Sequence, residues 1–216
     1  MINLEIIWLG HSCFRIKGKE ATVITDPCNP SFGYSPGELR ADIVTLSHLH
    51  PGHCYVEGIS GEFDVIEGPG EYEIKGVFIT GIGTFHDSEN GENRGKNTVY
   101  LLDIDGIVLC HLGDLGHALT SGLIEDIGGI EVLFVPVGGV STISSSVAVE
   151  IVRHLTPTIV IPMHYKTPAS VGDFEPVDKF LKELGAGEVV SRPKLSVTRS
   201  SLPNSTQVML LDYPRK

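Results

Sequence analysis

The chain has 216 residues, of which 41% are hydrophobic and 20% are charged, and its formal net charge is −11. This length fits one domain with a substantial core, and we expect residues 1–216 to form that single domain. The acidic charge excludes a large nucleic-acid-binding surface, which needs a basic face. No apolar run is long enough to span a bilayer and the first residues do not resemble a signal sequence, so we expect a cytoplasmic protein with no membrane partner.

Four cysteines, Cys13, Cys28, Cys54 and Cys110, occur without a C-x-x-C pair. Free thiols in a reducing cytoplasm explain this pattern better than disulfides do. Cys54 directly follows a histidine and is a weak candidate for a metal ligand, because adjacent side chains of an extended segment point apart.

The first part of the chain reads as short strands. The apolar residues 6–10, the alternating residues 13–17 and the apolar residues 21–25 predict an antiparallel meander. Residues 28–40 are rich in proline and glycine and predict a loop at the rim. Residues 42–46 predict a short buried strand, which leads into the segment Ser47-His48-Leu49-His50-Pro51-Gly52-His53.

Three of the nine histidines lie in this segment, at positions 48, 50 and 53. In an extended chain His48 and His50 point to the same side, and Pro51-Gly52 supplies a turn that brings His53 round to join them. Imidazole is the commonest metal ligand in proteins, so the spacing predicts a site for Zn²⁺ or a similar ion. A solvated histidine-rich loop is the alternative explanation.

The later part of the chain adds strands and then helices. Strands are expected at 64–67, 71–74 and 77–82, and a polar, glycine-rich loop at 88–97. Asp105-Gly106 is a strong turn signal and predicts a hairpin of residues 97–103 and 106–112. Helices at 121–127, 145–155 and 176–184 are expected to alternate with strands at 131–137 and 158–162, before closing strands near 195–197 and 208–211. This layout predicts two sheets packed face to face with helices outside.

One regularity points to a site. Five residues follow the C-terminal ends of five different apolar strands, namely Asp26, His48, His86, Asp114 and His164. Side chains placed in this way meet at one edge of a sheet, so we expect a centre for one or two Zn²⁺ ions there. Histidines bind as neutral ligands, and a shared carboxylate such as Asp114 lowers the charge and can bridge two ions. Taken singly, His111 and His164 also fit interior histidines with no metal role, and this explanation is favoured for His117 and His154.

With these motifs in view, the sequence resembles the metallo-β-lactamase fold superfamily, and within it the small stand-alone Zn-dependent hydrolases related to the ascorbate-6-phosphate lactonases. The matching segments are Leu9-Gly10-His11-Ser12, Thr25-Asp26-Pro27, Ser47 to His53, Phe85-His86, His111-Leu112-Gly113-Asp114 and Pro162-Met163-His164-Tyr165. The resemblance covers nearly the whole chain and thins after about Tyr165. It implies an α/β fold, the four-layer αββα sandwich, with a two-metal centre at one edge of the sheets.

The resemblance also implies roles for the site residues. Six residues would bind metal: His48, His50 and His86 the first ion, His53 and His164 the second, and Asp114 both. Asp26 would orient a ligand histidine. His11 would line the site and contact substrate without binding metal, so Asp114 and His11 are the candidate catalytic residues. Zinc is the expected cofactor, with manganese or iron as alternatives.

One position departs from the family motif H-x-H-x-D-H, because Gly52 stands where the motif has aspartate. In the family that aspartate binds the second metal and hydrogen-bonds the attacking hydroxide. Its loss predicts a weaker second site. Asp87 and Glu71 are the nearest acidic candidates for compensation, and nothing in the sequence shows that either reaches. We expect Gly52→Asp to raise metal content or activity.

Together these features predict a metal-dependent hydrolase, in which a hydroxide formed at the metal attacks an ester, lactone or phosphodiester of a small-molecule substrate. Arg94 and Asn97, in the polar loop after His86, are candidates for binding an anionic group on that substrate, although a solvated loop explains them equally well.

Two alternative functions compete with this interpretation. Gly52 favours a non-catalytic member that binds a metal or ligand for structure or sensing. An RNA-processing nuclease of the same superfamily is disfavoured by the acidic charge. The sequence does not distinguish a monomer from a homo-oligomer.

Overall fold

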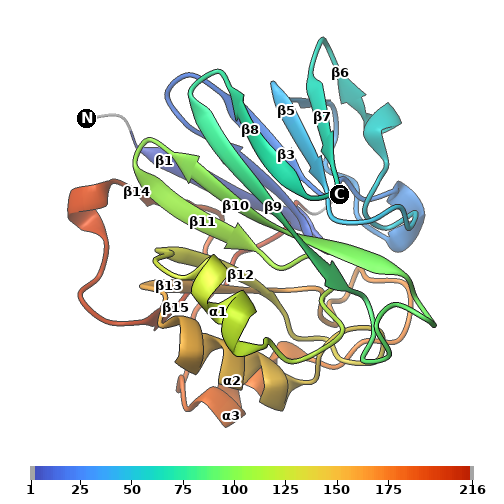
Figure 1. The fold of residues 1–216 in the computed structure, drawn as a ribbon, viewed down its shortest axis with the longest axis vertical. Coiled ribbons are helices and arrows are strands. Elements are labelled where there is room, and N and C mark those ends of the chain that lie inside the picture. Colours follow the sequence, from blue (N-terminus) through green and yellow to red (C-terminus); the bar gives the residue numbers. More distant parts are fainter. Residues whose placement is uncertain (1–2, 215–216) are drawn as a thin grey trace.

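The computed structural model describes residues 3–214, which form two facing β-sheets with three α-helices on one side (Figure 1). The first sheet has the order β14-β1-β2-β3-β5-β7 and consists of β1 (Leu4–Gly10), β2 (Cys13–Lys17), β3 (Thr22–Thr25), β5 (Ile43–Leu46), β7 (Asp64–Glu67) and β14 (Leu195–Val197). The second has the order β15-β13-β12-β11-β10-β9-β8 and consists of β8 (Gly70–Ile74), β9 (Val77–Phe85), β10 (Lys96–Ile104), β11 (Ile107–His111), β12 (Val132–Pro136), β13 (Ile159–Met163) and β15 (Gln207–Val208).

The main core lies between the two sheets, and the first sheet is buried on both faces. Residues of a strand point alternately to opposite faces. Trp8, Val23 and Ile43 therefore belong to the core shared with the second sheet. Their neighbours in the strands, such as Leu9 and Ile24, belong to a smaller apolar cluster on the outer face.

The outer cluster is covered by short elements. These are the 3₁₀ helices η1 (Pro30–Phe32) and η2 (Val56–Gly58) and the strand pair β4 (Leu39–Arg40) and β6 (Ile59–Ser60). Tyr34, Leu39 and Ile59 from this layer pack into the outer cluster. The proline- and glycine-rich composition of residues 28–40 explains why this layer contains 3₁₀ turns rather than a long α-helix.

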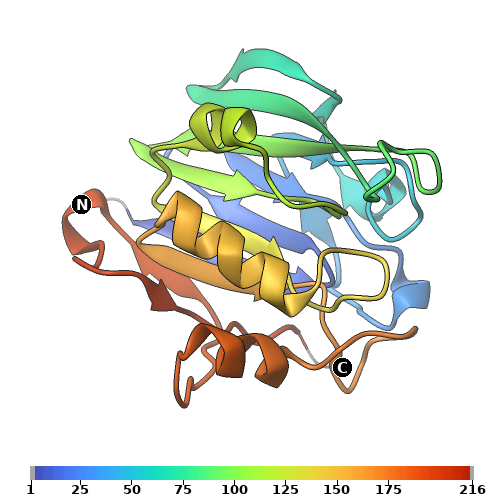
Figure 2. The same ribbon diagram turned by 60° about the horizontal axis from the view of Figure 1, so that its bottom comes forward.

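The helices α1 (Ser121–Ile127), α2 (Ser145–Leu155) and α3 (Val177–Leu184) lie beside the second sheet, and α2 contacts β12 and both other helices (Figure 2). Thr120 and Ser144 cap α1 and α2 by accepting backbone hydrogen bonds from Leu123 and Val147. A left-handed Gly185 ends α3. The three predicted helices, the paired sheets and the mixed α/β class are confirmed, whereas the closing strand predicted near 208–211 is shorter and begins one residue earlier.

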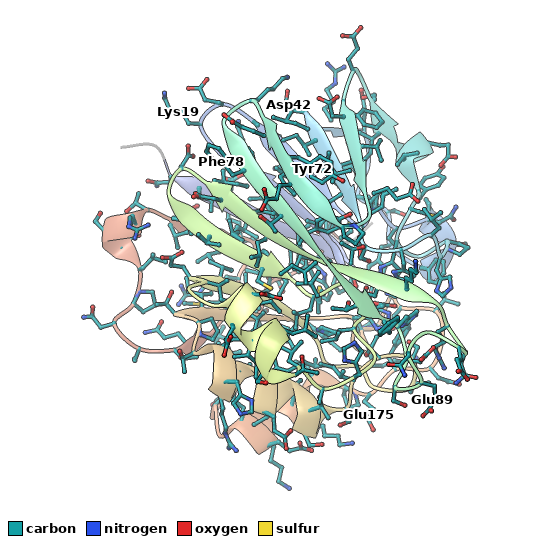
Figure 3. The ribbon with its side chains drawn as sticks, viewed as in Figure 1. Lys19, Asp42, Tyr72, Phe78, Glu89 and Glu175 are labelled. Carbon is teal, nitrogen blue, oxygen red and sulfur yellow. The ribbon has the colours of Figure 1, made fainter. Side chains whose placement is uncertain are left out.

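Strand directions bring the predicted site residues to one edge. Strands β3 and β5 are parallel, as are β11, β12 and β13, and β9 runs in the direction of β11 because both are antiparallel to β10. In Figure 3, Glu89 after β9 and Glu175 before α3 mark this end of the molecule, and Lys19 and Asp42 lie at the opposite end. The ends of five strands therefore meet where the loops gather.

Two features bear on the environment of the protein. Cys13, Cys28, Cys54 and Cys110 carry free thiols. None of the helices found between residues 3 and 214 has the length and apolar character needed to cross a membrane.

Candidate metal centre

One carboxylate oxygen lies at the middle of the site. Oδ2 of Asp114 is 3.1 Å from Nε2 of His53 and 3.3 Å from Nε2 of His164. It is also 3.5 Å from Nε2 of His86 and 3.9 Å from Nε2 of His48. All five side chains are buried. Four imidazoles from three parts of the chain thus face the same oxygen.

Asp26 fixes two of these histidines from behind. Its carboxylate accepts hydrogen bonds from the backbone N–H of Ser47 (2.7 Å), from Oγ of Ser47 (2.5 Å) and from Nδ1 of His53 (2.8 Å). Because the single hydroxyl proton of Ser47 goes to Asp26, Ser47 accepts from Nδ1 of His48 at 2.9 Å. Asp26 and Ser47 therefore direct Nε2 of both histidines toward Asp114.

Burial and charge set the protonation of the site. Burial alone would lower the pKa of His53, but Asp114 and Asp26 outweigh it and raise this pKa to about 10. Burial, reinforced by His53, lowers the pKa of His48 to about 3. The pKa of His86 is also lowered, mainly by burial. His48 and His86 are therefore neutral at pH 7, and His53 occupies a place between two carboxylates where a cation is favoured.

The donor set fits a divalent metal ion. Between residues 3 and 214, four buried atoms of the site have no hydrogen-bond partner: Nε2 of His48, Nδ1 of His86, Oδ1 of Asp114 and Nδ1 of His164. Unpartnered buried polar atoms are costly, so their concentration here needs an explanation. Imidazole nitrogen and carboxylate oxygen are ligands that Zn²⁺ prefers, and a cation at the centre would satisfy Nε2 of His48. For His86 and His164 it is Nε2 that faces Asp114, and the unpartnered Nδ1 is the other nitrogen of the ring.

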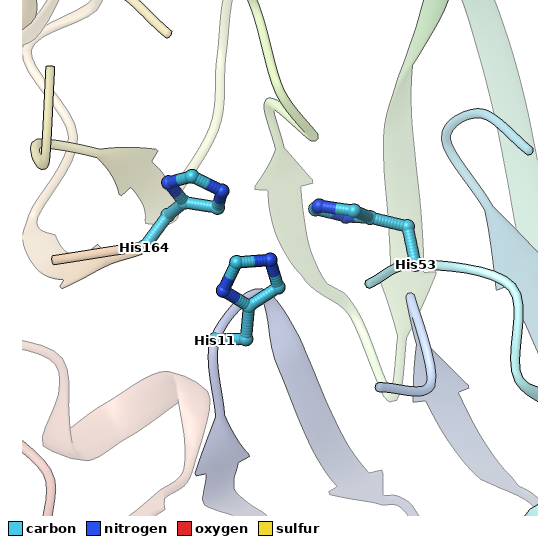
Figure 4. Close-up of side chains that lie close together, drawn as sticks. All are labelled: His11, His53 and His164. Carbon is cyan, nitrogen blue, oxygen red and sulfur yellow. The ribbon is translucent and has the colours of Figure 1, made fainter. Parts of the chain in front are cut away.

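Two groups of histidines have their ligand atoms within 4.8 Å of one another, and a third group within the same limit, Asp26 with His48 and His53, links the two. We call His48, His50 and His86 the first cluster, and His11, His53 and His164 the second cluster. The first reaches solvent through the exposed His50, whereas the second is wholly buried. Figure 4 shows the three rings of the second cluster converging from different parts of the chain.

Three site residues hold strained backbone conformations. His11, Asp26 and His164 have φ angles of 54°, 39° and 54°. For residues other than glycine this left-handed region costs about 1–2 kcal/mol each. The carbonyl of His11 accepts hydrogen bonds from Nε1 of Trp8 (3.0 Å) and from the backbone N–H of His164 (3.1 Å), which hold the β1–β2 turn in place. Strain that the surroundings maintain is typical of functional sites.

Asn97 does not line the pocket between the two clusters but a neighbouring pocket of about 450 Å³, and its side chain is held by hydrogen bonds within the protein. Its amide donates to Oγ1 of Thr84 (2.8 Å) and to the carbonyl of Leu112 (3.0 Å), and its carbonyl accepts from the backbone N–H of Asp114 (2.9 Å). The residue is buried, and these bonds use its donors and its acceptor. Asn97 therefore positions the central aspartate.

Arg94 lies at the rim of the site. It is exposed and lines a pocket of about 210 Å³ together with the second cluster, with His50 and His86 of the first cluster, and with Phe32, Gly52, Asp114, Ser141 and Phe174. The loop that carries Arg94 is held by Asp87, whose carboxylate accepts four backbone N–H bonds, from Glu89, Gly91, Asn93 and Arg94. The predicted substrate contact of Arg94 is compatible with this placement.

The other histidines have structural environments. His111 is buried, with Nε2 bonded to the carbonyl of Ser12 (2.8 Å) and Nδ1 accepting from the N–H of Gly113 (3.2 Å). Nε2 of His117 accepts from the N–H of Phe85 (3.2 Å), and His154 is exposed on α2. None of the three belongs to a metal-capable group within the described part of the chain.

Sequence reasoning missed three contributors. Ser47 links Asp26 to His48, and its place directly before the histidine motif is a signal that could have pointed to it. Phe32 and Phe174 pack against the ring of His11, at centroid distances of 5.3 Å and 5.7 Å. They lie in loops far apart in the sequence, and only the fold brings them to the site.

Comparison with known proteins gives consistent relationships. A family model described as the beta-lactamase superfamily domain matches residues 5–164. A UPF0173 metal-dependent hydrolase of Thermoplasma acidophilum is 32% identical, with 77% of this chain and 85% of that protein covered. A UPF0173 metal-dependent hydrolase of Methanopyrus kandleri is 28% identical, with 84% and 93% covered.

A solved structure is also similar. It is a protein of Thermotoga maritima described as a Zn-dependent hydrolase of the metallo-beta-lactamase superfamily. It is 39% identical to this chain, with 98% of this chain and 100% of that chain covered, and the TM-score is 0.82. Sequence and fold thus point to the same group of proteins.

Proposed function

The chain belongs to the metallo-β-lactamase superfamily, and from that membership we propose that it is a zinc-dependent hydrolase of a small anionic substrate. The observation that carries the proposal is the arrangement of four imidazole Nε2 atoms within 3.1–3.9 Å of Oδ2 of Asp114. Its relatives are described as metal-dependent hydrolases, which supports the reaction class.

Two sets of residues would hold the ions, and Asp114 belongs to both. The first cluster would bind one ion, and His53 and His164 would bind the other. When bound, Zn²⁺ lowers the pKa of a coordinated water to about 7 and polarises a carbonyl or phosphoryl oxygen of the substrate. Asp26 and Ser47 keep the ligand nitrogens aimed at the centre, so little reorganisation accompanies binding.

Asp114 is the residue best placed to orient the nucleophile. Its Oδ2 faces the histidines, while its Oδ1 is buried and has no hydrogen-bond partner in the described chain. Oδ1 can therefore accept a hydrogen bond from an attacking water. The backbone N–H of Asp114 donates a hydrogen bond to Oδ1 of Asn97, which fixes the position of this residue.

The substrate is expected to be small and to carry an anionic group. The pocket of about 210 Å³ has room for a small ester, lactone or phosphodiester. Arg94 at its rim suits a phosphate or carboxylate. The net charge of −11 opposes a nucleic-acid substrate. Buried free thiols support a reducing, cytoplasmic setting.

The test is to purify the protein without chelator, count metals by plasma mass spectrometry, and assay generic phosphodiesters and lactones after addition of Zn²⁺, Mn²⁺ or Fe²⁺. We expect bound zinc, and turnover that a chelator abolishes and Zn²⁺ restores. His48→Ala should lose both properties. His154→Ala, which alters an exposed histidine of α2, is the matched control and should keep them. A protein with neither metal nor turnover would contradict the proposal.

Gly52 supports a second candidate, a non-catalytic member that binds metal for structure or sensing. The family motif has an aspartate at this position, and glycine offers neither a ligand nor a proton acceptor. Tight metal binding without turnover of any substrate in the panel, together with a higher unfolding temperature of the metal-loaded protein, would favour this candidate over the hydrolase.

A further inference from the structure

We propose that His11 is a ligand of the second metal ion and takes the place of the aspartate that the family motif has at residue 52. The inference rests on the proposed function, because it assumes that the centre binds metal. It assigns His11 a role other than the substrate contact expected from the sequence.

The space beside Gly52 is filled by the ring of His11. A Cβ atom added to Gly52 would lie 2.8 Å from Nε2 and 3.2 Å from Cδ2 of His11, and 3.3 Å from Cε1 of Phe32. Gly52 is buried, and its φ is not among the positive φ angles found for the chain's glycines. Space, not backbone conformation, therefore requires glycine here, and the atom that uses this space is an imidazole nitrogen.

The ring of His11 is aimed at the second ion's ligands. Its centroid lies 4.2 Å from that of His164 and 4.8 Å from that of His53. One nitrogen from each of the three rings lies within 4.8 Å of the other two. Figure 4 shows the three rings facing one another. Contacts with Phe32 and Phe174 hold the His11 ring in this position.

The two acidic residues named as candidates, Asp87 and Glu71, do not supply the missing ligand. Both carboxylate oxygens of Asp87 accept backbone hydrogen bonds within its own loop. Glu71 is exposed on β8. When an ion is bound and His53 has given up its proton, the second site would consist of three neutral imidazoles and the shared Asp114, with one negative charge fewer than a site with the motif's aspartate.

Zinc stoichiometry tests this assignment. We titrate chelator-stripped protein with Zn²⁺ and measure the dissociation constant of each ion. Wild type is expected to bind two ions. His11→Ala should bind the first with unchanged affinity and the second about 100-fold more weakly or not at all. The double variant His11→Ala/Gly52→Asp should regain the second ion, because the carboxylate can then enter the space that the ring leaves.

The outcomes separate the two proposals. A wild type that binds no Zn²⁺ overturns the proposed function. Two ions of unchanged affinity in His11→Ala overturn the role of His11 alone. If His11→Ala loses the second ion and the double variant does not regain it, the proposal that His11 replaces an aspartate at residue 52 is overturned. His154→Ala is the matched control, and thermal unfolding shows whether each variant folds.

A spectroscopic test needs no substitution. In wild-type protein labelled with ¹⁵N-histidine and loaded with ¹¹³Cd²⁺, a ligand nitrogen shows a one-bond coupling to cadmium. We expect this coupling for a ring nitrogen of His11 as well as for His53 and His164. Coupling at His53 and His164 without any at His11 would overturn the inference while leaving the metal centre intact.

Discussion

The two histidine clusters share Asp114 but are built differently. The first takes two members, His48 and His50, from three consecutive residues and reaches solvent through His50. The second takes each member from a distant segment and is wholly buried. Oδ2 of Asp114 lies nearer to the second cluster, at 3.1 Å and 3.3 Å, than to the first, at 3.5 Å and 3.9 Å.

This difference shows that a local motif and a tertiary constellation can serve one centre. The first cluster depends on a short stretch of sequence and tolerates contact with water. The second depends on strained turns at His11 and His164 and on the surrounding packing. With three neutral histidines and one shared carboxylate, the second site is expected to be the weaker one.

The largest effect should follow from Asp114→Asn, which removes the charge that both clusters share. We expect both ions to be lost and turnover to fall by about 10³-fold, because metal stabilisation of the transition state amounts to several kcal/mol. Metal analysis and steady-state kinetics measure the two effects. Asp126→Asn, on the exposed side of α1, is the control. Retention of two ions by Asp114→Asn would show that the clusters do not share this residue.

Smaller effects are expected from substitutions of the two residues that bond the Nδ1 atoms of His53 and His48, and these effects should differ between the two ions. Asp26→Asn removes the acceptor of His53 and should weaken the second ion about 10–100-fold. Ser47→Ala removes the acceptor of Nδ1 of His48 and one hydrogen bond to Asp26, but it leaves the contact between Asp26 and His53, so it should weaken the first ion more than the second. Chelator-competition titrations of Zn²⁺ give both constants. Equal weakening of the two ions by Ser47→Ala would contradict the separation.

The next effect concerns substrate rather than metal. Arg94→Ala should raise KM for anionic substrates about 10-fold with little change in kcat, because a hydrogen bond to a charged group contributes about 1.5–3 kcal/mol. KM for an uncharged ester should not change. Lys182→Ala, an exposed residue of α3, is the control for the loss of a positive charge. An unchanged KM for both substrates would remove Arg94 from the site.

The smallest effect on the centre is expected at His111, a buried histidine outside both clusters. Burial lowers its pKa, so it stays neutral in the folded protein while the unfolded chain takes up a proton below about pH 6.5. Its contribution to stability is therefore present above pH 6.5 and is lost as the pH falls through its folded pKa.

His111→Gln removes this titration but keeps an amide donor for the carbonyl of Ser12. The stability difference between wild type and variant should shrink by up to about 2 kcal/mol from pH 7 to pH 5, without a change in metal content. Urea unfolding at several pH values measures it. The exposed His154→Gln should show no such trend. A parallel loss of zinc in His111→Gln would place His111 in the centre after all.

Strand ends were the most informative signal in the sequence. Hydrophobic runs ended by Asp26, His86, Asp114 and His164 predicted that these residues meet, and topology brings them together because the strands run in compatible directions. His11 also follows a strand, β1, whose direction matches that of β3 through two antiparallel pairings. The same rule therefore extends to a residue that was expected only to contact substrate.

Contacts between distant loops could not be predicted. The polar side chain of Asn97 suggested a substrate contact, but its hydrogen bonds to Leu112 and Asp114 depend on the pairing of neighbouring strands. Likewise, the sequence alone presents Gly52 as the loss of the aspartate ligand of the family motif. The position of the His11 ring, which gives the glycine its steric reason, exists only in three dimensions.

The four backbone hydrogen bonds that Asp87 accepts determine which substitutions its loop can tolerate. The carboxylate of Asp87 accepts hydrogen bonds from four backbone N–H groups. The shape of residues 88–94 therefore depends on the main chain and not on the identity of most side chains there. Exchanges at Glu89, Glu92 or Asn93 are therefore expected to leave the loop, and with it the place of Arg94 at the rim of the pocket, unchanged. We expect residues 88–94 to accept substitutions without disturbing the histidine clusters, which makes this loop a natural place to introduce new side chains beside the pocket.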